Sequence, residues 1–438
     1  MRVRRWCGAW GGLVAAGTLL LTLAAVPQAQ AQPSGTAVSR QSCALPSAGG
    51  QFDKASPASH ALDKGKVDEA IAYAAQHMRL SVQIFRDNCL VGSGPLNSVT
   101  QDVPFPMWSS TKSVISLLTG IAIDRGKLGL NDPIGKYLPK GWGDAAHRAI
   151  TVNQLLTQTS GLKQSIISEA ATSLLDPNVA QEALAYPLDH KPGTHWVYGQ
   201  RQVDLLGYVV HRAVGEDLGA FAQRNLFGPI GIPASSYAWL RDRSGQPYGY
   251  AHLFLPPVQY AKLGLLLENQ GAWNGRRVIS TSYVKSLSEP TPLNPCYGKL
   301  FWTNSGTRCT GADFPYEVTV NHRMVESAPG DLYAMVGFLH QNNFIIPSLG
   351  MVVSWTGVLG DTYPNISNLL SAVAASDLYH NFFRILMSGV KDVRVPDPGP
   401  FRGPEVNFEF DPTKIVDPGV IQKNLAPNVH CNVVRCDS

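Results

Sequence analysis

The chain has 438 residues, of which 44% are hydrophobic and 16% are charged, and its formal net charge is +4. It is long enough to bury a sizeable core, and its composition excludes collagen-like, coiled-coil and wholly disordered chains. Three of the positive charges, Arg2, Arg4 and Arg5, lie at the amino terminus, so the rest of the chain is close to neutral. A nearly neutral surface has no general attraction for nucleic acid or anionic lipid, and we expect neither as a partner.

The first 31 residues have the pattern of a secretory signal peptide. The basic residues at 2–5 are followed by an apolar stretch, and Ala-Gln-Ala at 29–31 is typical of a cleavage site. An uncleaved membrane anchor is the alternative, because the apolar run approaches the length that spans a bilayer. The small residues at the cleavage site favour removal, which predicts a secreted protein without a membrane anchor.

The cysteines fit an exported protein. Six of the seven lie after the predicted signal, and an even number favours disulfides in an oxidising compartment; these are Cys43, Cys89, Cys296, Cys309, Cys431 and Cys436. The near neighbours 296–309 and 431–436 are the most natural pairs, which leaves 43–89 by elimination. Six buried free thiols are the alternative. Neither Cys-x-x-Cys nor His-x-x-x-His occurs, so we expect no metal site.

Hydrophobic periodicity predicts the first elements in chain order. Residues 32–65 lack periodicity and are predicted to be an irregular, poorly ordered lead-in. A helix is predicted over 67–78, and strands over 80–86 and 89–91 with an Asp-Asn turn between them. A regular apolar stripe predicts a long helix over 109–125.

The rest of the chain predicts helices first and strands later. Residues 131–250 have the pattern of helices joined by Pro/Gly loops, without a convincing strand. The later elements are a helix at 258–268, a turn at 271–275, strands at 332–338, 344–346 and 351–355, and helices at 366–375 and 377–387. Residues 391–438 form a Pro-rich irregular extension. We therefore predict an α/β (α+β) fold, in which an antiparallel sheet flanked by helices is built from 66–130 and 251–390, with an all-helical insertion at 131–250.

A Ser-x-x-Lys pattern at a helix start can activate a serine. Three residues make nearly one helical turn, so the hydroxyl and the amine leave the same face, and the helix start favours an oxyanion. The pattern occurs at 109/112, 160/163, 282/285 and 388/391. Only Ser109 heads a long apolar helix, because residues 160 and 388 precede glycine and helix capping explains residue 282. The alternative for Ser109 is also a cap, with Lys112 in solvent.

The segment Met-Trp-Ser-Ser-Thr-Lys-Ser at 107–113 resembles the nucleophile motif of the serine β-lactamase and penicillin-binding-protein superfamily. More closely, the chain resembles the class C-like esterases and 6-aminohexanoate-dimer hydrolases. Three further blocks, at 128–139, 150–162 and 192–207, follow in the order of that family, with Gln158 where histidine is usual. The resemblance covers about residues 66–390 and implies a β-lactamase/transpeptidase-like fold.

The second family motif is matched at 198–200. By resemblance, Tyr198 is the tyrosine of a Tyr-x-Asn motif, and its phenol would relay a proton between Ser109 and Lys112. A buried aromatic bound to a loop carbonyl is the alternative. Gln200 stands where the motif has asparagine, and this longer amide would hold the substrate or Lys112.

The third family motif is the weakest match, because no Lys-Thr-Gly occurs in the chain. Its best counterpart is Gly-Phe-Leu-His-Gln at 337–341. In this segment His340 would donate to a substrate carboxylate or tune Lys112, and a backbone N–H near Gln341 would supply half of an oxyanion hole. A histidine satisfied at a strand end is the alternative for His340.

Together the motifs imply a secreted serine hydrolase that cleaves an ester or amide bond through an acyl-enzyme on Ser109. Lys112 and Tyr198 would transfer the protons, no cofactor would be needed, and the substrate would be a small ester, an amide or a short peptide. The alternatives are a D,D-peptidase or D-aminopeptidase acting on cell-wall peptides and, from another class, a non-catalytic binding module. Six large aromatic side chains after residue 140 are expected in the core rather than in a cleft; they are Trp142, Trp196, Trp239, Tyr248, Tyr250 and Trp302.

Overall fold

The computed structural model describes residues 40–402, except 166–168, 170, 186, 313–318 and 360–375, together with residue 418. The predicted signal at 1–31, the predicted helix at 366–375 and the predicted 431–436 disulfide lie outside the described residues. Within the part that is described, no helix combines the length and the apolar character needed to cross a bilayer.

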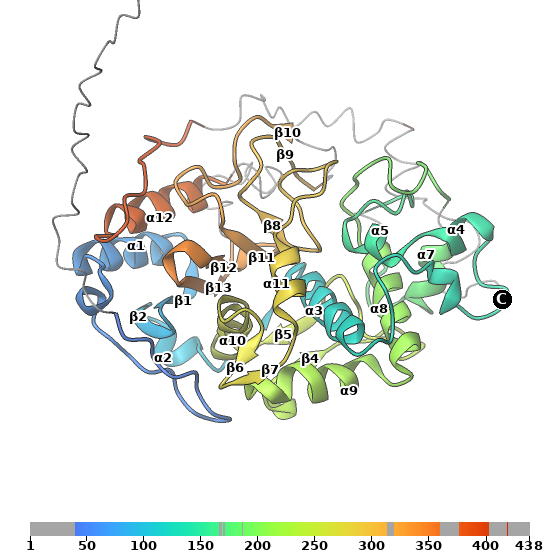
Figure 1. Cartoon of the computed structure of the whole chain (residues 1–438), viewed down its shortest axis with the longest axis horizontal. Coiled ribbons are helices and arrows are strands. Elements are labelled where there is room, and N and C mark those ends of the chain that lie inside the picture. Colours follow the sequence, from blue (N-terminus) through green and yellow to red (C-terminus); the bar gives the residue numbers. More distant parts are fainter. Residues whose placement is uncertain are drawn as a thin grey trace, which may run out of the picture. The chain divides into compact units, whose positions relative to one another are not determined.

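A six-stranded antiparallel sheet organises the described chain (Figure 1). Its order is β2-β1-β13-β12-β11-β8, and its strands are β1 (Arg79–Arg86), β2 (Cys89–Ser93), β8 (Trp302–Thr303), β11 (Tyr333–Gly337), β12 (Gln341–Ile346) and β13 (Met351–Gly357). Strand β1 pairs with β13, with Ile84 opposite Val353, so a strand from the first quarter of the chain lies beside a late one. This confirms the predicted antiparallel sheet with strands from both ends.

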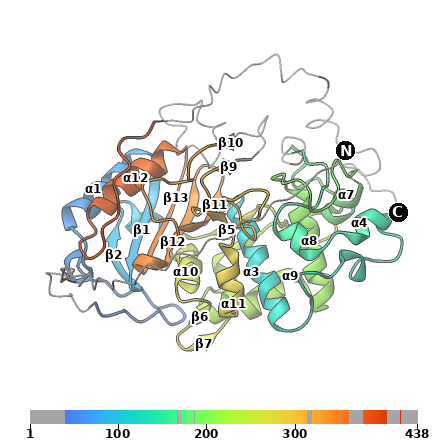
Figure 2. The same ribbon diagram turned by 45° about the horizontal axis from the view of Figure 1, so that its top comes forward.

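Helices cover both faces of this sheet (Figure 2). They are α1 (Lys64–Gln76) and α12 (Asp377–Ser388) on one face, and α3 (Ser110–Asp124) and α10 (Pro257–Glu268) on the other. Alternation along β12 explains the arrangement, because neighbouring residues of a strand point to opposite faces. Phe344 contacts the Tyr379 ring of α12, whereas the Asn343 amide donates to the Tyr260 carbonyl of α10, at 2.7 Å. The predicted α/β class with helices flanking the sheet is confirmed.

Helices are the main regular elements in the described part of residues 131–250. The helices are α4 (Ala145–Ala149), α5 (Val152–Leu156), α7 (Val179–Ala185), α8 (Arg201–Val214) and α9 (Leu218–Ala222). The expectation that this region contains no strand is wrong, because β4 (Ala238–Trp239) is a short strand. It pairs with β5 (Leu253–Leu255), which also pairs with β3 (Phe105–Pro106). A two-residue strand is too short to leave an alternating pattern in the sequence.

The remaining elements are short and connect the larger ones. They are α2 (Asn97–Thr100), α11 (Thr281–Leu287), β6 (Ala272–Trp273), β7 (Arg276–Arg277), β9 (Cys309–Thr310), β10 (Thr319–Val320) and the helical turns Pro57–His60, Ile134–Lys136, Gln223–Phe227, Gly228–Ile230, Ala234–Ser236 and Pro347–Leu349. The hairpin of β6 and β7 agrees with the turn predicted at 271–275.

The described part of the lead-in, residues 40–65, is packed, which differs from the expected poor order. A disulfide between Cys43 and Cys89 joins it to β2. Phe52 and Leu62 are buried, and the Phe52 ring meets the Phe85 ring edge-on at 4.8 Å. A few well-placed apolar side chains and one covalent link hold this segment, although its polar composition gives no periodic signal.

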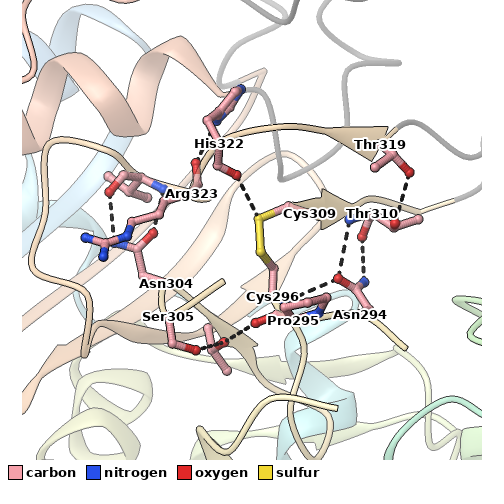
Figure 3. The surroundings of a disulfide bond; sticks show 12 residues. Asn294, Pro295, Cys296, Asn304, Ser305, Cys309, Thr310, Thr319, His322 and Arg323 are labelled. Atoms are coloured by element: carbon pink, nitrogen blue, oxygen red, sulfur yellow. Dashed lines mark hydrogen bonds between the residues drawn. A yellow bond between two sulfur atoms is a disulfide. The ribbon is translucent and has the colours of Figure 1, made fainter. Parts of the chain in front are cut away.

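A second disulfide joins Cys296 to Cys309 at the start of β9 (Figure 3). The Asn294 side chain binds the same segment, because its amide donates to the Thr310 carbonyl and its oxygen accepts from the Cys296 N–H. The predicted pairs 296–309 and 43–89 are therefore both confirmed.

Candidate active site

Ser109 lies where a tight turn enters α3. Trp108, directly before it, has a φ of +47°, which is rare and strained for a bulky residue. The turn is held from two sides: the Met107 N–H donates to the Leu253 carbonyl of β5, and a Cβ on Gly337 would lie 2.2 Å from the Met107 oxygen. The end of β11 therefore approaches the turn so closely that only glycine fits at position 337.

The Ser109 hydroxyl is a partner of Lys112 rather than a helix cap. Ser109 makes no side-chain capping hydrogen bond, whereas the Lys112 Nζ donates to the Ser109 Oγ at 2.9 Å. Lys112 is 1% exposed, and its Nζ also donates to the Tyr250 carbonyl at 3.1 Å. Burial lowers the pKa of Lys112 to about 7, against the smaller opposing effect of Asp204 and Glu169. This lysine can therefore be neutral at neutral pH.

The other three Ser-x-x-Lys patterns have ordinary local roles. The Ser160 hydroxyl donates to the Gln202 side chain, and the exposed Ser282 hydroxyl donates to Ser280. Ser388 bonds the Ile385 carbonyl at the end of α12. None of these three hydroxyls is described with a lysine partner, which separates them from Ser109.

Tyr198 completes the group around Ser109. The Lys112 Nζ lies 4.8 Å from the centre of the Tyr198 ring. Burial raises the pKa of Tyr198 well above its ordinary value, so the phenol stays protonated, and the Ser109 side chain is close enough to the Tyr198 hydroxyl to lower this pKa slightly. The buried Lys112 amine and the neutral Tyr198 phenol therefore both lie beside the Ser109 hydroxyl.

Three aromatic side chains pack around the Tyr198 ring. The centres of the Trp302 and Tyr297 rings lie 5.8 and 6.1 Å from it, and Trp196 lies at 6.3 Å. Trp196 and Trp302 are 3% and 4% exposed, and Tyr248 and Tyr250 are also buried, so these four are core residues. Trp142 and Trp239 are half-buried.

Gln200 and Gln158 stand at two of the places where the sequence departs from the pattern of the family that it resembles. Gln200 precedes α8 and is buried; among the described residues nothing donates a hydrogen bond to its side-chain oxygen. The Gln158 side chain accepts from the Gly199 N–H at 2.7 Å, and its carbonyl accepts from the Val197 N–H at 3.0 Å. Gln158 therefore braces the backbone on both sides of Tyr198, which sequence reasoning noted only as a departure.

The hairpin that joins β11 to β12 uses Leu339 and His340 where glycine would be usual. Both have positive φ, +55° and +59°, and Arg79 holds the turn by donating to both of their carbonyls. The Gln341 side chain closes it by a pair of hydrogen bonds with the Gly357 backbone. These hydrogen bonds explain how the turn forms without glycine.

His340 and Gln341 also bond two neighbouring helices, α12 and α3, and their predicted roles at the site stay predictions. The His340 Nδ1 lies 2.8 Å from the Tyr379 hydroxyl of α12, and the Gln341 carbonyl accepts from the Ser110 hydroxyl. The structure brings Ser109, Lys112 and Tyr198 together. The residue of β11 that approaches the Ser109 turn is Gly337. An oxyanion donor near Gln341 stays a prediction.

A buried ionic cluster beneath the site was missed by the sequence reasoning. Arg201 binds Asp176 at 2.6 Å, Asp204 at 2.8 Å and Glu182 at 3.1 Å. Burial raises the pKa of Asp204 to about 6, and that of Glu169 to about 7. Arg201 and Asp204 lie at the start of α8, just after the tyrosine motif, and this position in the sequence could have indicated that they support the site. Across the residues that the structure describes, no group of three or more His, Cys, Asp or Glu side chains could hold a metal ion.

Comparisons with known proteins agree with this architecture. The Beta-lactamase family model matches residues 71–281. Esterase EstB of Burkholderia gladioli is 28% identical over 190 residues, which is 39% of this chain and 47% of EstB, so this chain matches about half the length of that relative.

Two solved structures share the fold. A putative 6-aminohexanoate-dimer hydrolase from Bacillus anthracis has a TM-score of 0.56 and 14% identity, covering 68% of this chain and 79% of its own. A family VIII carboxylesterase has a TM-score of 0.54 and 18% identity, covering 74% and 98%. The β-lactamase/transpeptidase-like fold is thereby confirmed, and the family match over residues 71–281 agrees with the predicted resemblance to the serine β-lactamase and penicillin-binding-protein superfamily.

Proposed function

We propose that this chain is a secreted serine hydrolase that cleaves ester or amide bonds through an acyl-enzyme on Ser109. The observation that carries the proposal is the 2.9 Å hydrogen bond from the buried Lys112 amine to the Ser109 hydroxyl. The two disulfides are compatible with an exported protein, and the similarity to an esterase and to hydrolase structures supports the reaction class.

The reaction begins with proton removal from Ser109 by neutral Lys112. The Ser109 oxygen attacks the substrate carbonyl carbon, and the Ser109 N–H at the start of α3 stabilises the oxyanion. The tetrahedral intermediate then expels the alcohol or amine, which takes its proton from Lys112 directly or through the Tyr198 hydroxyl. Water attacks the acyl-enzyme by the same route, and the acid leaves as Ser109 regains its proton. Because the Tyr198 phenol stays protonated, we assign Lys112 rather than Tyr198 as the base.

The expected pH dependence follows from Lys112. Its pKa is lowered to about 7, and only the neutral amine accepts a proton, so kcat/KM rises with pH through about 7 and levels off above it. Initial rates with p-nitrophenyl acetate between pH 5 and 9, corrected for spontaneous hydrolysis, measure this profile. A profile that is flat, or whose acid limb lies near pH 4, would contradict the assignment of the base.

Aromatic and apolar side chains beside Ser109 favour esters with apolar groups as substrates. The Phe338 ring is 49% exposed and lies 5.7 Å from the Trp108 ring, which in turn lies 6.4 Å from His252. Burial lowers the pKa of His252, so this ring is neutral at pH 7. Neutral surroundings favour an apolar acyl chain over the charged end of a cell-wall peptide.

Phe338→Ala is therefore expected to change chain-length preference. The ratio of kcat/KM for p-nitrophenyl hexanoate to that for the acetate should fall about tenfold, because the longer chain loses its apolar contact. Val393→Ala, which truncates an exposed apolar side chain in the carboxyl-terminal extension, is the matched control and should leave the ratio unchanged. An unchanged ratio in Phe338→Ala would show that the acyl chain lies elsewhere.

The reaction class is tested by comparing p-nitrophenyl acetate, nitrocefin and D-Ala-D-Ala peptides as substrates. We expect turnover of the ester. Preferential cleavage of the peptides would favour the D,D-peptidase alternative, and folded protein that turns over none of the three would favour a binding module.

A further inference from the structure

Lys112 has a second anchor besides Ser109. Its Nζ donates to the Tyr250 carbonyl at 3.1 Å, so this carbonyl and the Ser109 Oγ together define where the amine points. Tyr250 lies in a loop outside any helix or strand. A loop carbonyl can orient a catalytic amine only if its peptide is itself held.

Asp204, in the first turn of α8, holds that peptide. Its Oδ1 accepts from the Gly249 N–H at 2.7 Å and from the Tyr250 N–H at 3.4 Å. The loop lies directly on the helix start, because a Cβ on Gly249 would be 2.5 Å from the Val203 carbonyl oxygen. The other Asp204 oxygen accepts from Arg201 at 2.8 Å, so the carboxylate is fixed from both sides.

We propose that Asp204 is a positioning residue for Lys112, whose carboxylate fixes the Gly249–Tyr250 peptide and thereby aims the Lys112 amine at Ser109. The inference rests on the proposed function of Ser109 and Lys112. Asp204 is 1% exposed, so water does not compete for these hydrogen bonds, and a buried carboxylate without such partners would be costly. Asp204 lies four residues after the end of the tyrosine motif at 198–200, which names no role for it.

Asp204 also acts on Lys112 through its charge. The titratable and charged groups around the amine come from several elements. Arg201 and Asp204 lie on α8 and Tyr198 lies just before it, while Tyr250 and His252 lie in the loop before β5. Glu169 lies in the segment before α7, and Asp176 and Glu182 lie behind Arg201. Of these, Asp204 and Glu169 raise the pKa of Lys112. Removing the Asp204 charge should therefore lower the pKa of Lys112.

Two substitutions separate the charge of Asp204 from its hydrogen bonds. Asp204→Asn keeps an acceptor for the Gly249 N–H, so the acid limb of kcat/KM should move to lower pH by roughly half a unit or more, with the plateau within a few-fold of the original. Asp204→Ala removes the acceptor too, and its plateau kcat should fall about tenfold or more because the amine is no longer aimed. Thermal melts establish that each variant is folded.

Asp176→Asn is the matched control. Asp176 binds the same Arg201 and the Tyr248 hydroxyl, but it makes no described contact with the Gly249 or Tyr250 peptide. This variant should keep both the position of the acid limb and the plateau. The inference is overturned if folded Asp204→Ala keeps the original plateau, or if Asp176→Asn loses as much activity as Asp204→Ala.

A measurement without turnover keeps this test independent of the proposed function. In ¹⁵N-lysine-labelled Ser109→Ala protein, NMR titration reports the pKa of Lys112 directly. Adding Asp204→Asn should lower that pKa, and adding Asp176→Asn should leave it unchanged; equal values in all three proteins would overturn the inference. A wild-type protein without activity would instead count against the proposed function alone.

Discussion

Ser109→Ala is expected to lower ester hydrolysis at least about 1000-fold. The alanine removes the side-chain oxygen that attacks the substrate carbonyl carbon, so no acyl-enzyme can form at this position. The measurement is kcat/KM for p-nitrophenyl acetate above pH 7.5, with circular dichroism and thermal melts to establish that the variant is folded.

Ser282→Ala is the control for this variant, because residue 282 also begins a Ser-x-x-Lys pattern. Its hydroxyl is exposed and bonds only Ser280 among its described contacts, so activity should stay within about twofold. If Ser109→Ala retains most of its activity, Ser109 is not the nucleophile.

Lys112→Met is expected to lose activity about as severely while the fold becomes more stable at pH 7. Methionine fills the same buried space but cannot accept the Ser109 proton. Because the folded-state pKa of Lys112 is lowered to about 7, the unfolded chain binds more protons between about pH 7 and 10, and the wild-type free energy of unfolding rises with pH across that range. The gain in melting temperature for Lys112→Met should therefore be larger at pH 7 than at pH 9.

Lys262→Met is the control that separates the loss of the catalytic amine from the gain in stability on removing a buried lysine. Lys262 is also 1% exposed, its amine donates to the Gly231 carbonyl, and burial lowers its pKa as well. This variant should keep hydrolysis near the wild-type rate, because no described contact joins Lys262 to Ser109. Activity that survives in Lys112→Met would contradict the role of Lys112 as base.

Much of the fold was accessible from the sequence because it follows local patterns. The apolar stripe of α3 and the alternation in β1 are strong periodic signals, and both elements form close to the predicted bounds. The motif residues Ser109, Lys112 and Tyr198 could be named because short spacing and helix geometry already bring the first two together. The packing of the lead-in had no such signal, since it depends on a disulfide and a few isolated apolar residues.

The supporting residues of the candidate site were not predictable in the same way. Asp204 acts through the backbone of a loop some 45 positions later, and no local pattern encodes that contact. The strain at Trp108 arises only when β5 and β11 close on the turn. The hydrogen bond between His340 and Tyr379, from a helix about 40 residues downstream, likewise has no local signal in the sequence.

Covalent labelling with a fluorophosphonate, followed by mass spectrometric mapping of the modified peptide, tests the central claim most directly. We predict one adduct per chain, located on Ser109, formed faster as the pH rises through about 7 and absent from Ser109→Ala. An adduct on another residue, or folded protein that carries none, would contradict the account.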